Sequence, residues 1–187
     1  EKPQRTLKGH YVIRETVSTS RVSSVYSAVA RNDASQRYAI KELSPIALFR
    51  ADERREAQTM LDTTLERWAR LQHVNLPRLI DSFTDRDKVY VVMEFVEGWS
   101  GTRIITERLN VTPELASNWG YQLCDLLAYL HAQKPDMHVP FLAPQHIMIG
   151  LDGTVKLIDW GLTALYTPTT YGPYGSIRGY GAPELQA

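Results

Sequence analysis

The sequence of 187 residues contains few features that would assign it to a specialised class. It has one cysteine, Cys124, so no disulfide can form within the chain, and we expect this residue to be a small buried apolar group in a helix. No apolar run approaches the roughly 18 residues of a membrane span, and no signal peptide is recognisable. Lys+Arg and Asp+Glu are equal at 21 each, so neither sign dominates. We therefore expect a cytoplasmic protein without nucleic-acid or membrane contacts.

The composition is that of an ordinary globular protein, with 43% apolar and 22% charged residues. Residues rich in Val, Ile and Tyr predict strands at 11–17, 22–31, 37–43, 79–84 and 88–95. Three- and four-residue apolar spacing predicts a helix at 51–71, with Met60 facing the core. A second helix should begin after Thr112 as cap and Pro113 as first helical residue. Its expected packing stripe is Leu115, Trp119, Leu123, Leu126, Leu127 and Leu130.

The stretch 144–161 carries the strongest local signal in the chain. Two aliphatic runs, 147–149 and 155–158, flank an Asp-Gly pair at Asp152, which is typical of a tight hairpin. The second run ends at Asp159, which is followed by tryptophan and glycine. A carboxylate at a strand end beside glycine is the kind of group that a metal–phosphate site needs.

The order of motifs resembles that of a protein kinase, and most closely a bacterial eukaryotic-like Ser/Thr kinase domain. The sequence AIK ending at Lys41 matches the VAIK motif, Asp-Trp-Gly replaces DFG, and APE ends at Glu184. This resemblance implies an α+β, two-lobe fold. Residues 1–97 would form an N-lobe with an antiparallel sheet, helix C and the hinge. Residues 98–187 would form a partial C-lobe with helices D and E, the catalytic loop and the activation loop, ending just after APE.

The resemblance also implies a set of nucleotide-binding residues. Lys41 would hold the phosphates and Asp159 a Mg²⁺ ion. The adenine would meet Val25, Ala39, Met93 as gatekeeper, Met148, and the backbone of Glu94 and Val96.

The loop that closes over the phosphates in kinases departs from the family pattern. Its three glycine positions hold Ser18, Ser20 and Ser23. Serine has a Cβ that restricts φ and hinders close approach of the backbone to phosphate. We therefore expect ATP and Mg²⁺ to bind weakly or not at all.

The family's helix C glutamate, which pairs with the lysine, can be placed in two ways. The segment REAQTML favours Glu56, and about eight extra residues then lengthen the helix. Counting back from His73 without an insertion places Thr64 in this position instead. We expect Glu56, because its neighbours match the family.

The catalytic loop lacks its chemical groups. With Pro144 as anchor, Phe141 occupies the position of the catalytic aspartate and Ala143 that of the lysine. His146 takes the place of the metal-binding asparagine. If His138 is instead taken as the family histidine, the aspartate position falls on Pro140. Neither register leaves a general base.

The resemblance and these losses together predict a catalytically impaired kinase-like domain, a pseudokinase in signalling. It would act as a regulatory or protein-interaction module, with a protein partner or self-association. The alternative is an active Ser/Thr kinase that transfers the ATP γ-phosphate with displaced residues, of which Asp136 and His138 are the candidates. Because the chain begins at Glu1 rather than methionine, we expect it to be a piece of a longer protein.

Overall fold

A computed structural model describes residues 5–20, 23–44, 51–139, 142–159, 162 and 180. The chain divides into two compact units. The first holds the described residues up to Leu71 together with Arg78–Phe95. The second holds Gln72–Pro77 and the described residues from Val96 to Leu162.

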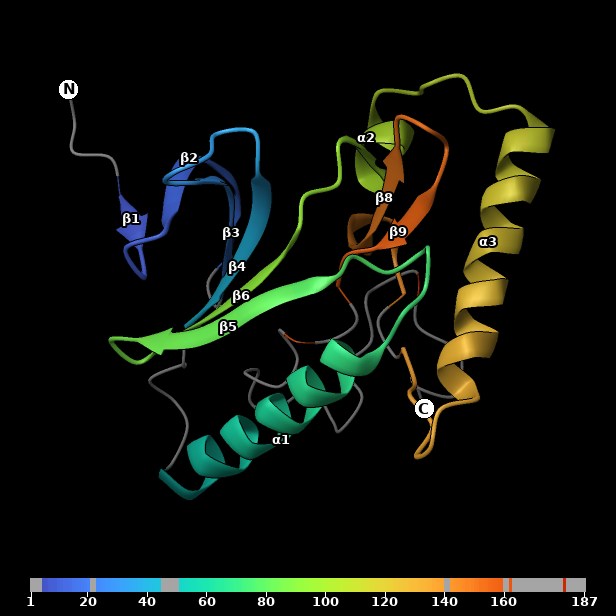
Figure 1. The fold of residues 1–187 in the computed structure, drawn as a ribbon. Coiled ribbons are helices and arrows are strands. Elements are labelled where there is room, and N and C mark those ends of the chain that lie inside the picture. Colours follow the sequence, from blue (N-terminus) through green and yellow to red (C-terminus); the bar gives the residue numbers. More distant parts are fainter. Residues whose placement is uncertain are drawn as a thin grey trace. The chain divides into compact units, whose positions relative to one another are not determined.

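The first unit contains a six-stranded antiparallel sheet in the order β1-β2-β3-β4-β6-β5 (Figure 1). Its strands are β1 Thr6–Leu7, β2 Tyr11–Thr19, β3 Ser23–Ala30, β4 Arg37–Leu43, β5 Leu79–Asp85 and β6 Lys88–Glu94. All five predicted strands are present, and β4 has the predicted bounds. The β5–β6 turn forms because Arg86 and Asp87 adopt φ values of 48° and 62°, as two-residue hairpin turns require.

One face of this sheet carries an aromatic and ionic cluster. Glu42 is only 3% exposed and accepts hydrogen bonds from Arg5 at 2.8 Å, from Lys88 and from the Tyr26 hydroxyl. Around these groups lies a buried apolar set of Leu7, Tyr11, Tyr26, Ala28, Ile40, Tyr90 and Val92. Arg5, just before β1, therefore packs against this face of the sheet.

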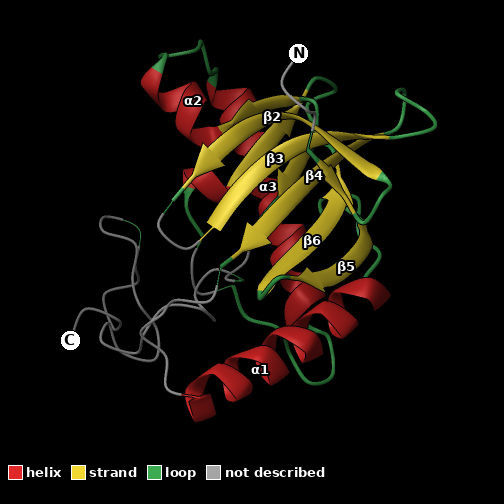
Figure 2. Cartoon of the chain, turned by 90° about the vertical axis from the view of Figure 1, so that its left-hand side faces the viewer, coloured by secondary structure: helices red, strands yellow, loops and turns green. Residues whose placement is uncertain are grey.

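Helix α1, Ala51–Arg70, lies beside β5 in the same unit (Figure 2). Its buried residues Ala57, Leu61, Leu65 and Trp68 follow helical spacing, as the apolar pattern predicts. The expectation that Met60 faces the core is wrong, because its side chain is 52% exposed. Met60 precedes Leu61 by one position, which turns it by about 100° from the buried stripe.

The second unit contains a three-stranded antiparallel sheet in the order β7-β8-β9, the short helix α2, the long helix α3 and one 3₁₀ turn. Its elements are β7 Gly98–Ser100, α2 Gly101–Thr106, α3 Pro113–His131, the 3₁₀ turn Pro144–His146, β8 Ile147–Gly150 and β9 Val155–Leu157. The predicted hairpin is confirmed. Gly153 has a φ of 82°, and the Asp152 carboxylate accepts from the backbone N–H and the hydroxyl of Thr154, both at 2.9 Å.

Helix α3 begins as predicted, since the Thr112 hydroxyl accepts from the backbone N–H of Leu115 at 3.3 Å. Leu126 and Leu130 are fully buried, whereas Leu115 is 43% exposed and leaves the predicted stripe. The expectation of a buried Cys124 is also wrong, because this thiol is exposed. Nine residues separate Leu115 from Cys124, so the two side chains lie on roughly opposite sides of α3. None of the described helices is long and apolar enough to cross a membrane.

Candidate functional site

The register of the first unit's sheet gathers four predicted nucleotide-binding residues on one face. Val25 pairs with Lys41, and Ala39 pairs with Met93. Paired residues in an antiparallel ladder share a face, and Ala39 and Lys41 are two positions apart on β4. Lys41 and Met93 are buried at 5% and 4% exposure, while Val25 and Ala39 are half-buried. These four positions therefore place three apolar side chains beside the ammonium group of Lys41.

The end of β6 carries the predicted hinge residues. The backbone N–H of Glu94 donates to the carbonyl of Arg78 at 3.0 Å. The Glu94 carboxylate accepts from the backbone N–H of Arg78 at 3.2 Å. Val96, two residues on, is half-buried. A base that met this segment would therefore have to use the carbonyl rather than the N–H of Glu94.

Helix α1 presents the two candidate positions for the helix C glutamate differently. Glu56 is exposed, and no ion pair joins it to Lys41 among the described residues. Thr64 is half-buried and lies one helical turn from Trp68, which is 2% exposed. The Thr64 hydroxyl donates to the carbonyl of Met60 at 2.8 Å. The structure thus does not bring Glu56 and Lys41 together.

In the loop between β2 and β3, polar groups form hydrogen bonds with one another. The backbone N–H of Ser20 donates to the Ser23 carbonyl at 2.7 Å, and the N–H of Ser23 donates to Ser20 Oγ at 3.1 Å. Ser18 is exposed and pairs with Val25. Two amides at the tip of this hairpin are therefore satisfied within the loop, and a phosphate would have to displace these bonds.

The second unit brings His146 and Asp159 together. Their side chains are 17% and 14% exposed, and Nε2 of His146 lies 4.0 Å from Oδ2 of Asp159. The backbone N–H of Ile158 donates to the His146 carbonyl at 2.8 Å, which fixes the two segments side by side. Met148 follows on β8 and is half-buried, and Ala143 is buried at 2% exposure. Phe141 and Pro140 lie outside the described residues.

This pair fits a magnesium ion only in part. Mg²⁺ prefers oxygen ligands in near-octahedral geometry, so the Asp159 carboxylate suits it. The imidazole of His146 offers nitrogen where the family's asparagine offers oxygen, and it is a poor replacement. In the described part of the chain, no group of three or more His, Cys, Asp or Glu residues could hold a metal ion. The described residues at this pair therefore offer a metal one carboxylate, that of Asp159.

The candidates for a displaced general base form an ion pair of their own. Nε2 of His138 lies 2.9 Å from Oδ2 of Asp136, and the side chains are 71% and 54% exposed. The His138 ring also lies 5.5 Å from that of His131. Both side chains of this pair are therefore largely exposed to solvent.

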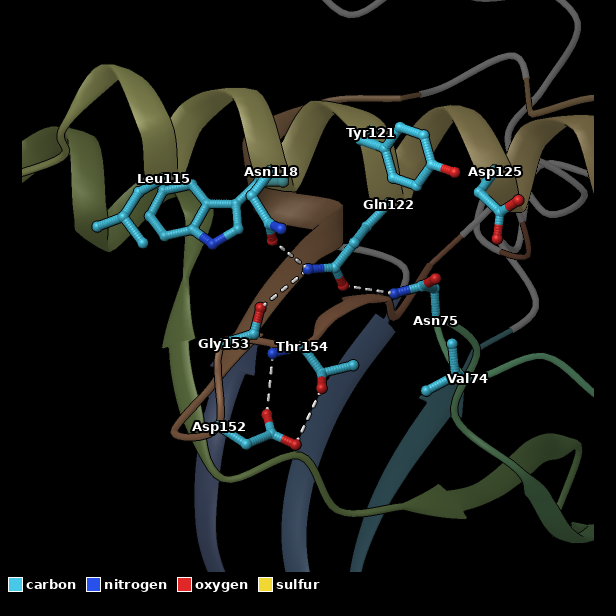
Figure 3. Close-up of a pocket in the computed structure, with 11 residues that line it drawn as sticks. Val74, Asn75, Leu115, Asn118, Tyr121, Gln122, Asp125, Asp152, Gly153 and Thr154 are labelled. Atoms are coloured by element: carbon cyan, nitrogen blue, oxygen red, sulfur yellow. Dashed lines mark hydrogen bonds between the residues drawn. The ribbon is translucent and has the colours of Figure 1, made fainter.

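A second candidate site was not predicted from the sequence. A groove with a volume of about 470 Å³ lies between α3, the turn of the β8–β9 hairpin and residues 74–75 (Figure 3). We call it the α3 groove. It is lined by side chains that include Val74, Leu115, Trp119, Tyr121, Asp125 and Asp152. No pattern in the sequence indicated it, because the lining residues come from three separate segments of the chain.

The comparisons with known proteins agree on one family. The family model described as "Protein kinase domain" matches residues 11–186. Calcium/calmodulin-dependent protein kinase type 1 of Caenorhabditis elegans is 26% identical over 98% of this chain and 51% of its own length. The protein of the same name from Macrobrachium nipponense is 29% identical over 95% of this chain and 50% of its own length. The chain thus spans about half the length of these curated relatives.

Solved structures show the same fold. Rad53 1-466 in complex with AMP-PNP superposes with a TM-score of 0.69 at 24% identity, covering 82% of this chain and 39% of that chain. The apo form of PpkA-294 also gives a TM-score of 0.69, at 18% identity, over 87% of this chain and 62% of that chain.

Proposed function

The chain belongs to the protein kinase family and has its fold, and from this premise we propose that it is a pseudokinase that acts as a regulatory or protein-interaction module. The observation that carries the proposal is the imidazole of His146 beside the Asp159 carboxylate, at the position of the family's metal-binding asparagine. The bacterial origin and the cytoplasmic location expected from the sequence remain predictions.

Phosphoryl transfer depends on positioning and on neutralising charge, so each lost group matters. A kinase site needs a carboxylate and an amide oxygen for its two metal ions, and here only Asp159 has suitable chemistry. Phe141 and Ala143, in the positions of the catalytic aspartate and lysine, carry no polar side-chain group. Loss of a positioned general base alone typically lowers the rate by about 10²–10⁴.

The proposal extends to weak or absent ATP binding. Lys41 on its apolar sheet face and Asp159 are retained, and Met148 keeps its half-buried place on β8. Against them stand the hydrogen bonds between Ser20 and Ser23, which occupy the tip of the phosphate-covering loop. Breaking them would offset part of the free energy gained from phosphate contacts.

The exposure pattern of α1 supports the loss of another family group. A residue one turn before a buried helix position shares its face. Thr64 lies one turn before the buried Trp68 and so faces the core side of α1. Glu56 lies one turn before the exposed Met60 and so faces the solvent side. We therefore propose that Thr64, rather than Glu56, takes the helix C glutamate position. The family's carboxylate would then be absent from this position of the helix.

The proposal is tested by measuring ATP-dependent labelling of generic protein substrates together with ligand-induced thermal shifts. We expect equal background labelling for the wild-type chain and for Asp159→Ala. At an ATP concentration about five times Kd, binding adds only about 1 kcal/mol to the free energy of unfolding. If ATP binds weakly, the thermal shift is therefore measurable only at millimolar ATP. Because one carboxylate holds the metal, Mg²⁺ should add little to that shift.

A repair variant supplies the positive control. Phe141→Asp combined with His146→Asn restores two family groups, and we expect it to increase the Mg²⁺-dependent thermal shift by ATP relative to the wild type. Labelling by the wild type that disappears in Asp159→Ala would overturn the proposal. Loss of the same labelling in Asp136→Asn or His138→Gln would identify the displaced base of an active kinase instead.

A further inference from the structure

The α3 groove has a floor that is fixed by hydrogen bonds. The Gln122 side chain donates to Asn118 Oδ1 at 2.7 Å and to the Gly153 carbonyl at 3.2 Å (Figure 3). Its Oε1 accepts from Asn75 Nδ2 at 2.8 Å and from the backbone N–H of Val155 at 2.9 Å. One amide thus ties α3 to the hairpin and to residue 75. A floor held in this way loses little conformational entropy when a ligand binds.

The sides of the groove expose apolar groups. Leu115, Val74 and Tyr121 are 43%, 67% and 74% exposed. The indole Nε1 of Trp119, which also lines the groove, is buried and has no hydrogen-bond partner among the described residues. A buried N–H without an acceptor is costly, and a small rearrangement that let a ligand carbonyl reach it would remove this cost.

The charge of the groove is negative. Among the described residues that line it, Asp125 and Asp152 are the charged ones (Figure 3). The Thr154 backbone N–H and hydroxyl hold the pKa of Asp152 below its ordinary value, with Lys156 adding to the effect, so this carboxylate is ionised at neutral pH. Asp125 is 60% exposed, and its Oδ2 lies 3.3 Å from Nε2 of His73, which leaves Oδ1 for another donor.

We propose that the α3 groove binds a short segment of a partner protein in which a lysine or arginine lies close to an aliphatic side chain. Charge complementarity argues for the basic residue, since the described lining residues include two carboxylates and no cation. Contact with Leu115 and Val74 would take up the aliphatic side chain. A small molecule fits less well, because sites for such ligands bury most of the ligand, whereas the rim residues here leave the groove open.

This inference goes beyond the proposed function, since it concerns a different part of the second unit and holds whether or not the chain transfers phosphate. Its test uses no nucleotide, so its failure and that of the pseudokinase proposal can be told apart. The probe is a fluorescent peptide of roughly ten residues, with two arginines followed by two leucines in a background of Ala, Ser and Gly. Binding is followed by anisotropy at concentrations up to about 1 mM.

Matched variants separate charge from apolar contact. Asp152→Asn removes the charge and keeps an oxygen that can accept from Thr154, and we expect about threefold weaker binding and a smaller salt dependence. Leu115→Ala should weaken binding about fivefold. Glu107→Gln and Ile105→Ala, at exposed positions on or next to α2, are the controls and should leave binding unchanged. All four side chains are exposed enough to be changed without loss of folding, which thermal melting checks.

Three results would overturn the proposal. The first is no binding of the peptide up to about 1 mM, or equal binding by the wild type, Asp152→Asn and Leu115→Ala. The second is equal affinity for a peptide with glutamates in place of the arginines. The third is self-association of the wild type, seen by light scattering and abolished by Leu115→Ala, which would make a second copy of the chain the occupant.

Discussion

The side chain of Asn75 offers a sharp test of the described packing. It is 1% exposed, and its Nδ2 donates to the Val155 carbonyl at 2.7 Å and to Gln122 Oε1 at 2.8 Å. Asn75→Ala removes both bonds. A hydrogen bond of this kind contributes about 1 kcal/mol net to the free energy of unfolding. The Val155 carbonyl, however, belongs to a fully buried residue, so leaving it without a donor costs about 1–3 kcal/mol. The expected loss in free energy of unfolding is therefore about 2–4 kcal/mol.

The assay is urea unfolding followed by far-UV circular dichroism, with the slope compared between variants so that a change in midpoint reports stability. Asn75→Asp keeps the volume of the side chain and removes only the donor. We expect it to be at least as destabilising as Asn75→Ala at neutral pH, because a carboxylate would face the Val155 carbonyl and Gln122 Oε1.

Two further variants complete this test. Asn118→Ala loses one bond to Gln122 at an exposed position and should cost less than about 0.5 kcal/mol. In a double-mutant cycle, Asn75→Ala and Gln122→Ala should show a coupling of about 1 kcal/mol, because they share a bond. An Asn75→Ala variant within about 0.5 kcal/mol of the wild type would refute the assignment of these hydrogen bonds.

Three other predictions concern single elements. Trp68→Ala should cost about 3–5 kcal/mol in urea unfolding and Met60→Ala less than about 0.5, and the reverse order would contradict the described face of α1. Thr112→Ala should cost about 1 kcal/mol through loss of the α3 cap, while Thr112→Ser should cost much less. Burial raises the pKa of Glu42, but hydrogen bonds from Lys88 and Arg5 outweigh burial and leave this pKa below its ordinary value of 4.5. Glu42→Gln should therefore cost about 1–2 kcal/mol at pH 7, since the two cations it leaves are 45% and 41% exposed and regain water. The ionised form of Glu42 stabilises the fold at pH values above its ordinary pKa of 4.5. The difference in free energy of unfolding between Glu42→Gln and the wild type should therefore shrink as the pH falls below about 4.5. Urea unfolding at a series of acidic pH values would show this.

Local sequence signals were sufficient for most elements of the fold. The bounds of β4, the start of α3 at Thr112 and the hairpin at Asp152 follow from residue types within a few positions. The face that a helix buries depends on what packs against it. That is why Met60 and Cys124 were placed inside although both are exposed.

The sequence predicts site residues that belong to a family motif. It does not predict a site whose residues come from segments far apart in the chain. The order of the motifs placed Val25, Lys41 and Met93 as family equivalents, and the sheet register puts them on one face. The α3 groove draws on segments around residues 74, 118 and 153, and no local pattern in any of them indicates that they meet.

The contacts of Arg5 also bear on the order in which the chain folds. Its guanidinium donates to the Tyr90 hydroxyl at 2.8 Å, across 85 positions of sequence, and to Glu42 across 37. This partner set is complete only after β6 has been synthesised and paired with β4. Contacts of such sequence separation carry a large loop-closure entropy and form late. In pulsed hydrogen exchange during refolding, we therefore expect amides of β3, β4 and β6 to gain protection before those of β1, so that the strand which precedes the others of this sheet in the chain is the last to be secured.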